Sequence, residues 1–181
     1  MKGFIFGYLV DFVEESFGLE LVDELISEVD LPSKGVYVSF ESYEFSELVA
    51  LVSAVSVKKN VPVEDLLEGF GRYVFPFLIS RHDYIITDYS DPLELIAGIE
   101  NHIHIEVRKL YDDAELPSFK NVSRTENKLI INYTSQRELA HFAIGLIKET
   151  LGHFNKKGTI SMEKLNDQAH TTQFIIEVLE S

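Results

Sequence analysis

FKNVSRTENKLIINYTSQR, residues 119–137, contains two short segments rich in alternating and β-branched side chains. They run roughly from Phe119 to Arg124 and from Lys128 to Ser135, and the polar TEN between them is typical of a tight connection. The pattern predicts a β-hairpin. Because the patterns before it are helical, the hairpin marks the point at which the chain passes from helices to strands.

The residues upstream of this hairpin predict mainly helices. Apolar side chains recur at three- and four-residue steps from Lys2 to Phe17, with Gly18 as a stop, and a second short helix ends before Pro32. Further helices are expected at 45–58, 63–80 and 92–111, the last opened by Pro92.

Two of these helices carry expectations about burial. GFGRYVFPFLI, residues 69–79, is so apolar that we expect it to be buried on nearly every side. The long helix from Pro92 is expected to turn one stripe towards the core, formed by Leu95, Ile96, Ile99, Ile103, Val107 and Leu110.

Downstream of the hairpin, the chain predicts a helix followed by two more strands. The helix is expected from Glu138 to Phe154, and the strands at 159–164 and 172–179, with Asn166 and Asp167 in the turn between them. Helices first and hairpin-linked strands later predict an α+β fold with an antiparallel sheet. We expect one domain with a helical lobe over about 1–82 and an α/β lobe over about 83–181.

Charge and composition narrow the function classes. Lys and Arg number 16 against 30 Asp and Glu, for a formal net charge of -14, so the molecule repels nucleic acid and anionic membrane surfaces. No run reaches transmembrane length, and acidic Asp11, Glu14 and Glu15 argue against a signal peptide. The absence of cysteine favours a reducing compartment. We expect a cytoplasmic protein.

Tyr133, Ser135 and Arg137 alternate in the YTSQR motif that ends the hairpin. On a strand, these three side chains would share one face with Leu129 and Ile131, whose apolar character indicates a buried side. An arginine fork with two hydroxyl groups is well suited to receive carboxylate oxygens. The alternative is a solvated strand face.

The six histidines fit none of the common catalytic templates, and no nucleophile or acid–base pair is visible, so we do not expect an enzyme. His102 and His104 lie on the expected helix 92–111, where a two-residue spacing separates side chains by about 200°, so they should not share an ion. His104 lies one turn before Val107 and flanks the core stripe. It is the candidate to face inward.

Five segments together resemble the haem-nitric oxide/oxygen-binding (H-NOX) family, which includes the sensor domain of soluble guanylate cyclase. They are MKGFIFGYL at 1–9, GRYVFPF at 71–77, HIEVRKLYDDAELPSF at 104–119, YTSQR at 133–137 and IGLI at 144–147. The resemblance covers essentially the whole chain.

This resemblance implies that haem b (iron protoporphyrin IX) is held between the two lobes. By the same resemblance, His104 is the axial iron ligand, and the haem propionates bind to Tyr133, Ser135 and Arg137. Two further sets are implied: Ile5, Pro117 and Leu146 pack on the macrocycle, and Leu9, Val74 and Phe142 line the distal pocket.

The implied distal residues bear on the choice of gas. Oxygen-binding members of the family carry tryptophan, asparagine and tyrosine where this chain has Leu9, Val74 and Phe142. A distal hydrogen bond would contribute on the order of 1 to 3 kcal/mol to dioxygen binding. Because these side chains lack a donor, we expect nitric oxide, and with it carbon monoxide, rather than dioxygen. His141, about 100° from Phe142 around the helix, is expected outside the pocket.

The resemblance also implies a mechanism and a kind of partner. Nitric oxide weakens or breaks the bond between iron and His104, and the helix that carries His104 moves against the other lobe. We expect a stand-alone sensor that regulates a separate signalling protein, such as a histidine kinase or a cyclic-di-nucleotide enzyme.

The chain departs from the family pattern at two points. Asp112 stands where many relatives have proline, and the cysteine-rich zinc site of several bacterial relatives has no counterpart. His141, His153 and His170 are either remnants of that site or solvated histidines. Two other functions stay open: an oxygen-responsive or haem-carrier module of the same fold, and a haem-free acidic adaptor.

Overall fold

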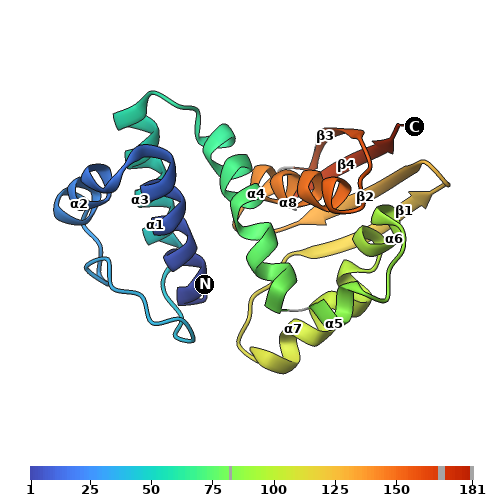
Figure 1. Cartoon of the computed structure of the whole chain (residues 1–181), viewed down its shortest axis with the longest axis horizontal. Coiled ribbons are helices and arrows are strands. Elements are labelled where there is room, and N and C mark those ends of the chain that lie inside the picture. Colours follow the sequence, from blue (N-terminus) through green and yellow to red (C-terminus); the bar gives the residue numbers. More distant parts are fainter. Residues whose placement is uncertain (82, 167–169, 180–181) are drawn as a thin grey trace.

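The computed structural model describes residues 1–81, 83–166 and 170–179. Its first part is helical, as expected, and the bounds lie close to those that the sequence predicts. The helices are α1 (Gly3–Phe17), α2 (Leu19–Glu28), α3 (Phe45–Lys59) and α4 (Val63–Arg81). In Figure 1, α1, α2 and α3 form a group on one side of the molecule, and α4 runs through its middle.

The segment expected as one long helix over 92–111 is helical over most of its length, but it is divided into three pieces. These are α6 (Pro92–Ala97), the π-helix η1 (Ile99–Ile103) and α7 (His104–Leu110), preceded by the short α5 (Asp83–Ile86). Asp91 begins α6, where its side chain accepts a hydrogen bond of 2.9 Å from the backbone N–H of Glu94. Pro92 at the first helical position has no N–H to leave unpaired.

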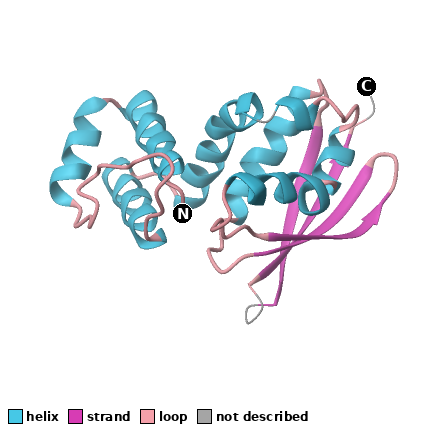
Figure 2. Ribbon diagram, turned by 90° about the horizontal axis from the view of Figure 1, so that it is seen from below, coloured by secondary structure: helices cyan, strands magenta, loops and turns pink. Residues whose placement is uncertain are grey.

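The second half contains one helix and a four-stranded antiparallel sheet, so the α+β prediction is confirmed. The elements are β1 (Ser118–Arg124), β2 (Lys128–Thr134), α8 (Ala140–His153), β3 (Gly158–Asn166) and β4 (Thr171–Val178). The strand order is β1-β2-β4-β3, so β2 lies in the interior of the sheet. Figure 2 shows helices packed on one side of this sheet. Of the expected turn between the last two strands, Asp167 lies outside the described residues.

Two hydrophobic cores stabilise the molecule. The N-terminal core is formed by buried side chains of α1 to α4, among them Phe6, Leu9, Leu48, Phe70 and Val74. The sheet core joins α6 and α8 to the inner face of β2 and β4, and includes Leu93, Ile96, Leu129, Ile131, Tyr133, Ile147, Phe174 and Ile176. The alternation on β2 is as expected, since Leu129 and Ile131 are fully buried.

Helices α4 and α8 connect the two cores by a backbone-to-backbone contact. A Cβ atom on Gly71 would lie 2.2 Å from the carbonyl oxygen of Phe142, and one on Gly145 would lie 2.2 Å from the carbonyl oxygen of Glu68. Any larger residue would push the helices apart. Figure 1 shows the two helices side by side.

The expectation that residues 69–79 are buried on nearly every side is wrong. Phe70 and Val74 are buried, but Phe77 is 36% exposed and stacks on Tyr8 with ring centroids 4.7 Å apart. The outer face of α4 is therefore not buried in a core. Part of it is covered by stacking between aromatic rings. Within the described ranges, no helix combines the length and apolar character that crossing a membrane would need.

Candidate functional site

His104 is the first residue of α7, and the π-helix before it decides where its side chain points. The backbone N–H of Ile103 lies 3.4 Å from the carbonyl oxygen of Gly98, five residues earlier, and the N–H of His104 bonds to Ile99 in the same way. One extra residue in a turn rotates everything after it by about 100°. His104 is buried as a result, at 7% exposure, between partly exposed neighbours.

The same rotation explains why the predicted core stripe fails towards its end. Leu95 and Ile96 precede the π-helix and are buried. Beyond it, Val107 is only half-buried, and Leu110 is 56% exposed. The inward face that the stripe was expected to fill belongs to His104 instead.

The His104 imidazole has one polar partner and one aromatic one. Its Nδ1 lies 3.3 Å from Oε2 of Glu100, and its ring meets that of Phe119 edge-on at 5.6 Å. No hydrogen bond joins Nε2 to any residue that the structure describes. Burial lowers the pKa of His104, and the Glu100 carboxylate opposes this shift. A neutral imidazole with a free nitrogen is the form that binds iron.

Glu100 is held by three groups at once. In addition to His104, the backbone N–H of Phe119 donates to its Oε2 at 3.0 Å, and Arg108 donates to its Oε1 at 3.3 Å. Burial raises the pKa of Glu100, but these three donors outweigh burial and leave the pKa below its ordinary value. The sequence prediction missed this residue, although its four-residue spacing from His104 would have indicated contact on a helix.

The YTSQR motif leaves the sheet before it ends, so its expected strand alternation is wrong. Strand β2 ends at Thr134, and Ser135 begins a turn in which its hydroxyl oxygen accepts the backbone N–H of Arg137 at 3.2 Å. Glu138 follows with a φ of 49°, in the left-handed region. The short polar side chain of Ser135 thus pairs with a backbone N–H of the turn. This turn directs Arg137 away from the strand.

Tyr133, Ser135 and Arg137 still meet, through this turn. Burial raises the pKa of the Tyr133 hydroxyl above its ordinary value, while the Ser135 hydroxyl, the Leu139 N–H and the Arg137 charge all act on it in the opposite direction. The Tyr133 ring packs on Phe119 at 5.3 Å, which in turn contacts His104. One continuous path of side chains therefore connects the motif to the histidine.

The Arg137 guanidinium already holds a carboxylate in this structure. It donates to the side-chain carboxylate of Glu115 and, at 2.9 Å, to the backbone carbonyl of the same residue. Arg137 is 19% exposed, whereas Glu115 is 81% exposed and could swing away. The guanidinium also lies 5.8 Å from the ring of Phe45, at the start of α3. A haem propionate presents the same chemical group as Glu115.

The residues expected on the opposite side of a bound group lie in or against the N-terminal core. Leu9 and Val74 are buried, and Ile5 and Phe142 pack against the same core. The ring centroids of Phe142 and Phe70 are 5.1 Å apart. Each of the three expected distal side chains is apolar. Pro117 and Leu146 are half-buried and belong to neither core as the described residues define them.

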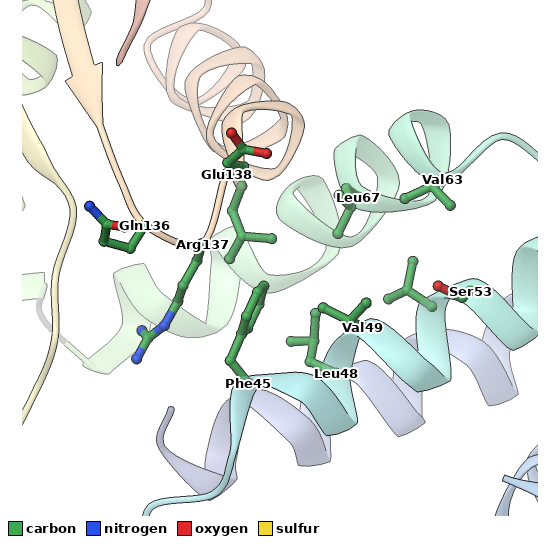
Figure 3. Close-up of a pocket in the computed structure, with 11 residues that line it drawn as sticks. Phe45, Leu48, Val49, Ser53, Val63, Leu67, Gln136, Arg137 and Glu138 are labelled. Carbon is green, nitrogen blue, oxygen red and sulfur yellow. The ribbon is translucent and has the colours of Figure 1, made fainter. Parts of the chain in front are cut away.

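A cavity of about 290 Å³ lies beside the motif, between α3, α4 and residues 136–139. Figure 3 shows Phe45, Leu48 and Val49 of α3 on one wall, with the guanidinium of Arg137 pointing away from Glu138. The sequence prediction did not include this cavity. It adjoins the motif through Arg137.

The other histidines are placed away from His104. His102 accepts or donates a 2.8 Å hydrogen bond between its Nδ1 and the Tyr89 hydroxyl. His153 packs on Phe154, and His170 pairs with Glu138 at 2.9 Å. Among the described side chains there is no group of three or more His, Cys, Asp or Glu residues that could hold a metal ion. His82 lies outside the described residues.

Taken together, the residues present fit a haem. The chain offers a buried imidazole with Nε2 unengaged, a guanidinium that already pairs with a carboxylate, two hydroxyl groups beside it and apolar side chains in the N-terminal core. These are the donor types that an iron porphyrin with two propionates requires.

Comparisons with known proteins agree with this fit. The family model described as Haem-NO-binding matches residues 2–162. The structure of the unliganded Fe(II) H-NOX protein from K. algicida is 41% identical with a TM-score of 0.96, covering 100% of this chain and 98% of that one. An H-NOX protein from S. oneidensis in the Fe(II)NO state is 34% identical with a TM-score of 0.90, covering 99% and 100%.

A third similar structure is the H-NOX from Shewanella woodyi in the Fe(II)CO state. It is 36% identical with a TM-score of 0.82, covering 98% of this chain and 94% of that one. The family model spans most of the sequence, and these relatives match over nearly its full length. The chain therefore belongs to the haem-NO-binding (H-NOX) family, whose members bind haem and act as gas sensors.

Proposed function

We propose that this chain binds haem b and senses nitric oxide in the cytoplasm, with His104 as the protein ligand to iron. The observation that carries the proposal is the buried imidazole of His104, whose Nδ1 faces Glu100 and whose Nε2 makes no hydrogen bond to a described residue. A nitrogen left free in a buried site is available to a metal.

Tyr133, Ser135 and Arg137 would bind the haem propionates. The carboxylate of Glu115 now pairs with Arg137, and its high exposure allows a propionate to replace it. Because Arg137 is largely buried, its guanidinium favours a lasting carboxylate partner.

Haem held by His104 would supply an iron(II) centre able to bind a diatomic gas. Leu9, Val74 and Phe142 are the side chains proposed to meet that gas, and none carries a hydrogen-bond donor. Dioxygen depends on such a donor more than nitric oxide does. These apolar side chains therefore support nitric oxide, and carbon monoxide with it, over dioxygen.

The far end of the His104 helix is joined to the N-terminal helices. Tyr111, just past α7, contacts the ring of Phe4 at 5.7 Å, and Nζ of Lys2 lies 2.6 and 2.8 Å from the carboxylate oxygens of Asp113. These contacts would transmit a displacement of His104 from the α/β lobe (about 83–181) to the helical lobe (about 1–82). We propose that this movement is read by a separate signalling protein, such as a histidine kinase or a cyclic-di-nucleotide enzyme.

The proposal is tested by optical spectra of the reduced protein with and without nitric oxide. We expect a Soret band of histidine-ligated iron, which nitric oxide converts to a form without the histidine. His104→Ala should remove the histidine-ligated spectrum. His102→Gln is the matched control, because His102 is engaged with Tyr89, and it should leave the spectrum unchanged.

Three results would count against the proposal. An unchanged spectrum in His104→Ala would exclude this residue as the ligand. A lasting oxygenated spectrum in air would favour an oxygen-responsive module. Protein without Soret absorption, even when haem is supplied during expression, would favour a haem-free acidic adaptor.

A further inference from the structure

Glu100 lies one helical turn before His104 and extends its carboxylate to the side of the imidazole away from the free nitrogen. Its Oε2 lies 3.3 Å from Nδ1 of His104. The two side chains are 27% and 9% exposed, so water competes little for this contact.

The carboxylate is fixed in place from both sides. The backbone N–H of Phe119, in β1, donates to the same Oε2 at 3.0 Å, and Arg108 holds the other oxygen at 3.3 Å. The Phe119 ring also packs edge-on against His104. Glu100 is thus anchored to the sheet and to α7 at once, and its oxygen keeps one direction towards Nδ1.

An imidazole whose Nδ1–H donates a hydrogen bond to a carboxylate keeps its lone pair on Nε2. That nitrogen then becomes a stronger electron donor. We propose that Glu100 is a positioning residue for the iron ligand, which fixes the tautomer and ring orientation of His104 and strengthens its bond to iron. This inference rests on the proposed function.

Arg108 acts on the same arrangement in the opposite sense. It contacts Oε1 of Glu100 and is 45% exposed, so it withdraws part of the carboxylate charge that would otherwise act on His104. The pair Glu100 and Arg108 therefore sets an intermediate bond strength. An intermediate strength would let His104 hold a bound haem without fixing the bond at its strongest.

The test uses resonance Raman spectra of the haem-bound, reduced, gas-free protein, in which the iron–histidine stretching frequency reports bond strength. Glu100→Gln keeps the shape and removes the charge, and we expect the frequency to fall. Arg108→Met should raise it. Glu106→Gln is the matched control, because this carboxylate lies in α7 with His104 but pairs with Lys109. The iron–histidine frequency of this variant should equal that of the wild type.

A second readout is the rate of haem transfer to an excess of acceptor globin. Glu100→Gln should lose haem about tenfold faster than the wild type and the Glu106→Gln control, as is common when the outer partner of a metal-binding histidine is removed. Circular dichroism of each variant establishes that the fold is retained.

The failure of this inference can be told apart from the failure of the proposed function. If the wild type carries histidine-ligated haem but Glu100→Gln matches it in frequency and haem loss, Glu100 has no such role and the sensor function stands. If Glu100→Gln does not fold, Arg108→Met decides alone, and a frequency at or below that of the wild type overturns the inference.

Discussion

At the scale of the residue, Arg137 joins parts of the chain that are far apart in sequence. Its backbone is set by Ser135, its guanidinium reaches Glu115 before the sheet, and the ring of Phe45 lies beside it. A single side chain thereby connects the turn after β2 to α3 and to the segment after α7. Its value for ligand binding depends on this fixed position.

Replacing Arg137 with Gln should weaken haem binding about tenfold to a hundredfold, because a charged hydrogen bond to a propionate is lost. Protein stability should change little, since the present partner Glu115 is 81% exposed. Haem titration of the apoprotein measures the affinity. Arg124→Gln, which breaks a surface pair with Asp91, is the control, and equal affinities for the two variants would contradict the assignment.

A donor placed among the expected distal side chains should change the gas that is bound. Phe142→Tyr adds a hydroxyl beside Phe70, and we expect dioxygen affinity to rise about fivefold to a hundredfold. Phe142→Leu alters the shape without adding a donor and should give no gain. Oxygen titration of the reduced proteins distinguishes the two, and a similar affinity in both would argue against a distal position for this residue.

At the scale of the element, two interruptions of regular structure place the site. The π-helix η1 rotates His104 inward, and the turn after Thr134 carries Ser135 and Arg137 off the strand. Both cost regular backbone geometry, and both end at side chains with a proposed ligand role. The crossing of α4 and α8 is the third constraint, because it fixes the distance between the two cores.

The crossing can be tested at two glycines of the same helix. Gly145→Ala would place a Cβ 2.2 Å from the Glu68 carbonyl oxygen and 3.0 Å from the Gly71 Cα, and the helices would have to separate. We expect a loss of about 1 to 3 kcal/mol in the free energy of unfolding. Gly152→Ala meets nothing within 4 Å and should stabilise α8 by about 0.5 to 1 kcal/mol. Urea unfolding measures both, and equal midpoints would refute the close contact.

At the scale of the whole molecule, the segment after α7 is tied to the N-terminus. Asp113 accepts from Lys2 and, at 2.9 Å, from Ser42, while Lys2 and Ser42 are themselves bridged by their backbones. Hydrogen bonds from Lys2 and Ser42 lower the pKa of Asp113 from its ordinary value of 3.8. This contact therefore depends on the ionised carboxylate.

Asp113→Asn should lower the urea midpoint at neutral pH, and the difference from the wild type should shrink in acid. Because the folded pKa is the lower one, the stabilisation is complete above the ordinary value of 3.8 and is lost as the pH falls through the folded value below it. Urea titrations at pH 7 and pH 3 measure this. Asp112→Asn, at the neighbouring exposed carboxylate, is the control, and an equal effect of both changes would contradict the role of Asp113.

Much of the architecture was predictable because it depends on local periodicity. The apolar spacing of α1 and the helix-start preference of Pro92 act over only a few residues. The hairpin of β1 and β2 likewise follows from alternation and a short polar connection. The ligand roles of His104 and YTSQR came from the resemblance to the family, because periodicity indicated only which side chains share a face.

The sequence by itself determined the α+β class, the order of its main helices and strands, and the residue types available to the candidate site. Only the tertiary structure decided that His104 turns inward, that Glu100 and Phe119 fix it, and that Arg137 reaches Glu115. The physical reason is the range of the forces involved. A prediction from periodicity assumes the same rotation about the helix or strand axis at every residue. The π-helix, the turn and these contacts instead depend on groups that only folding brings together.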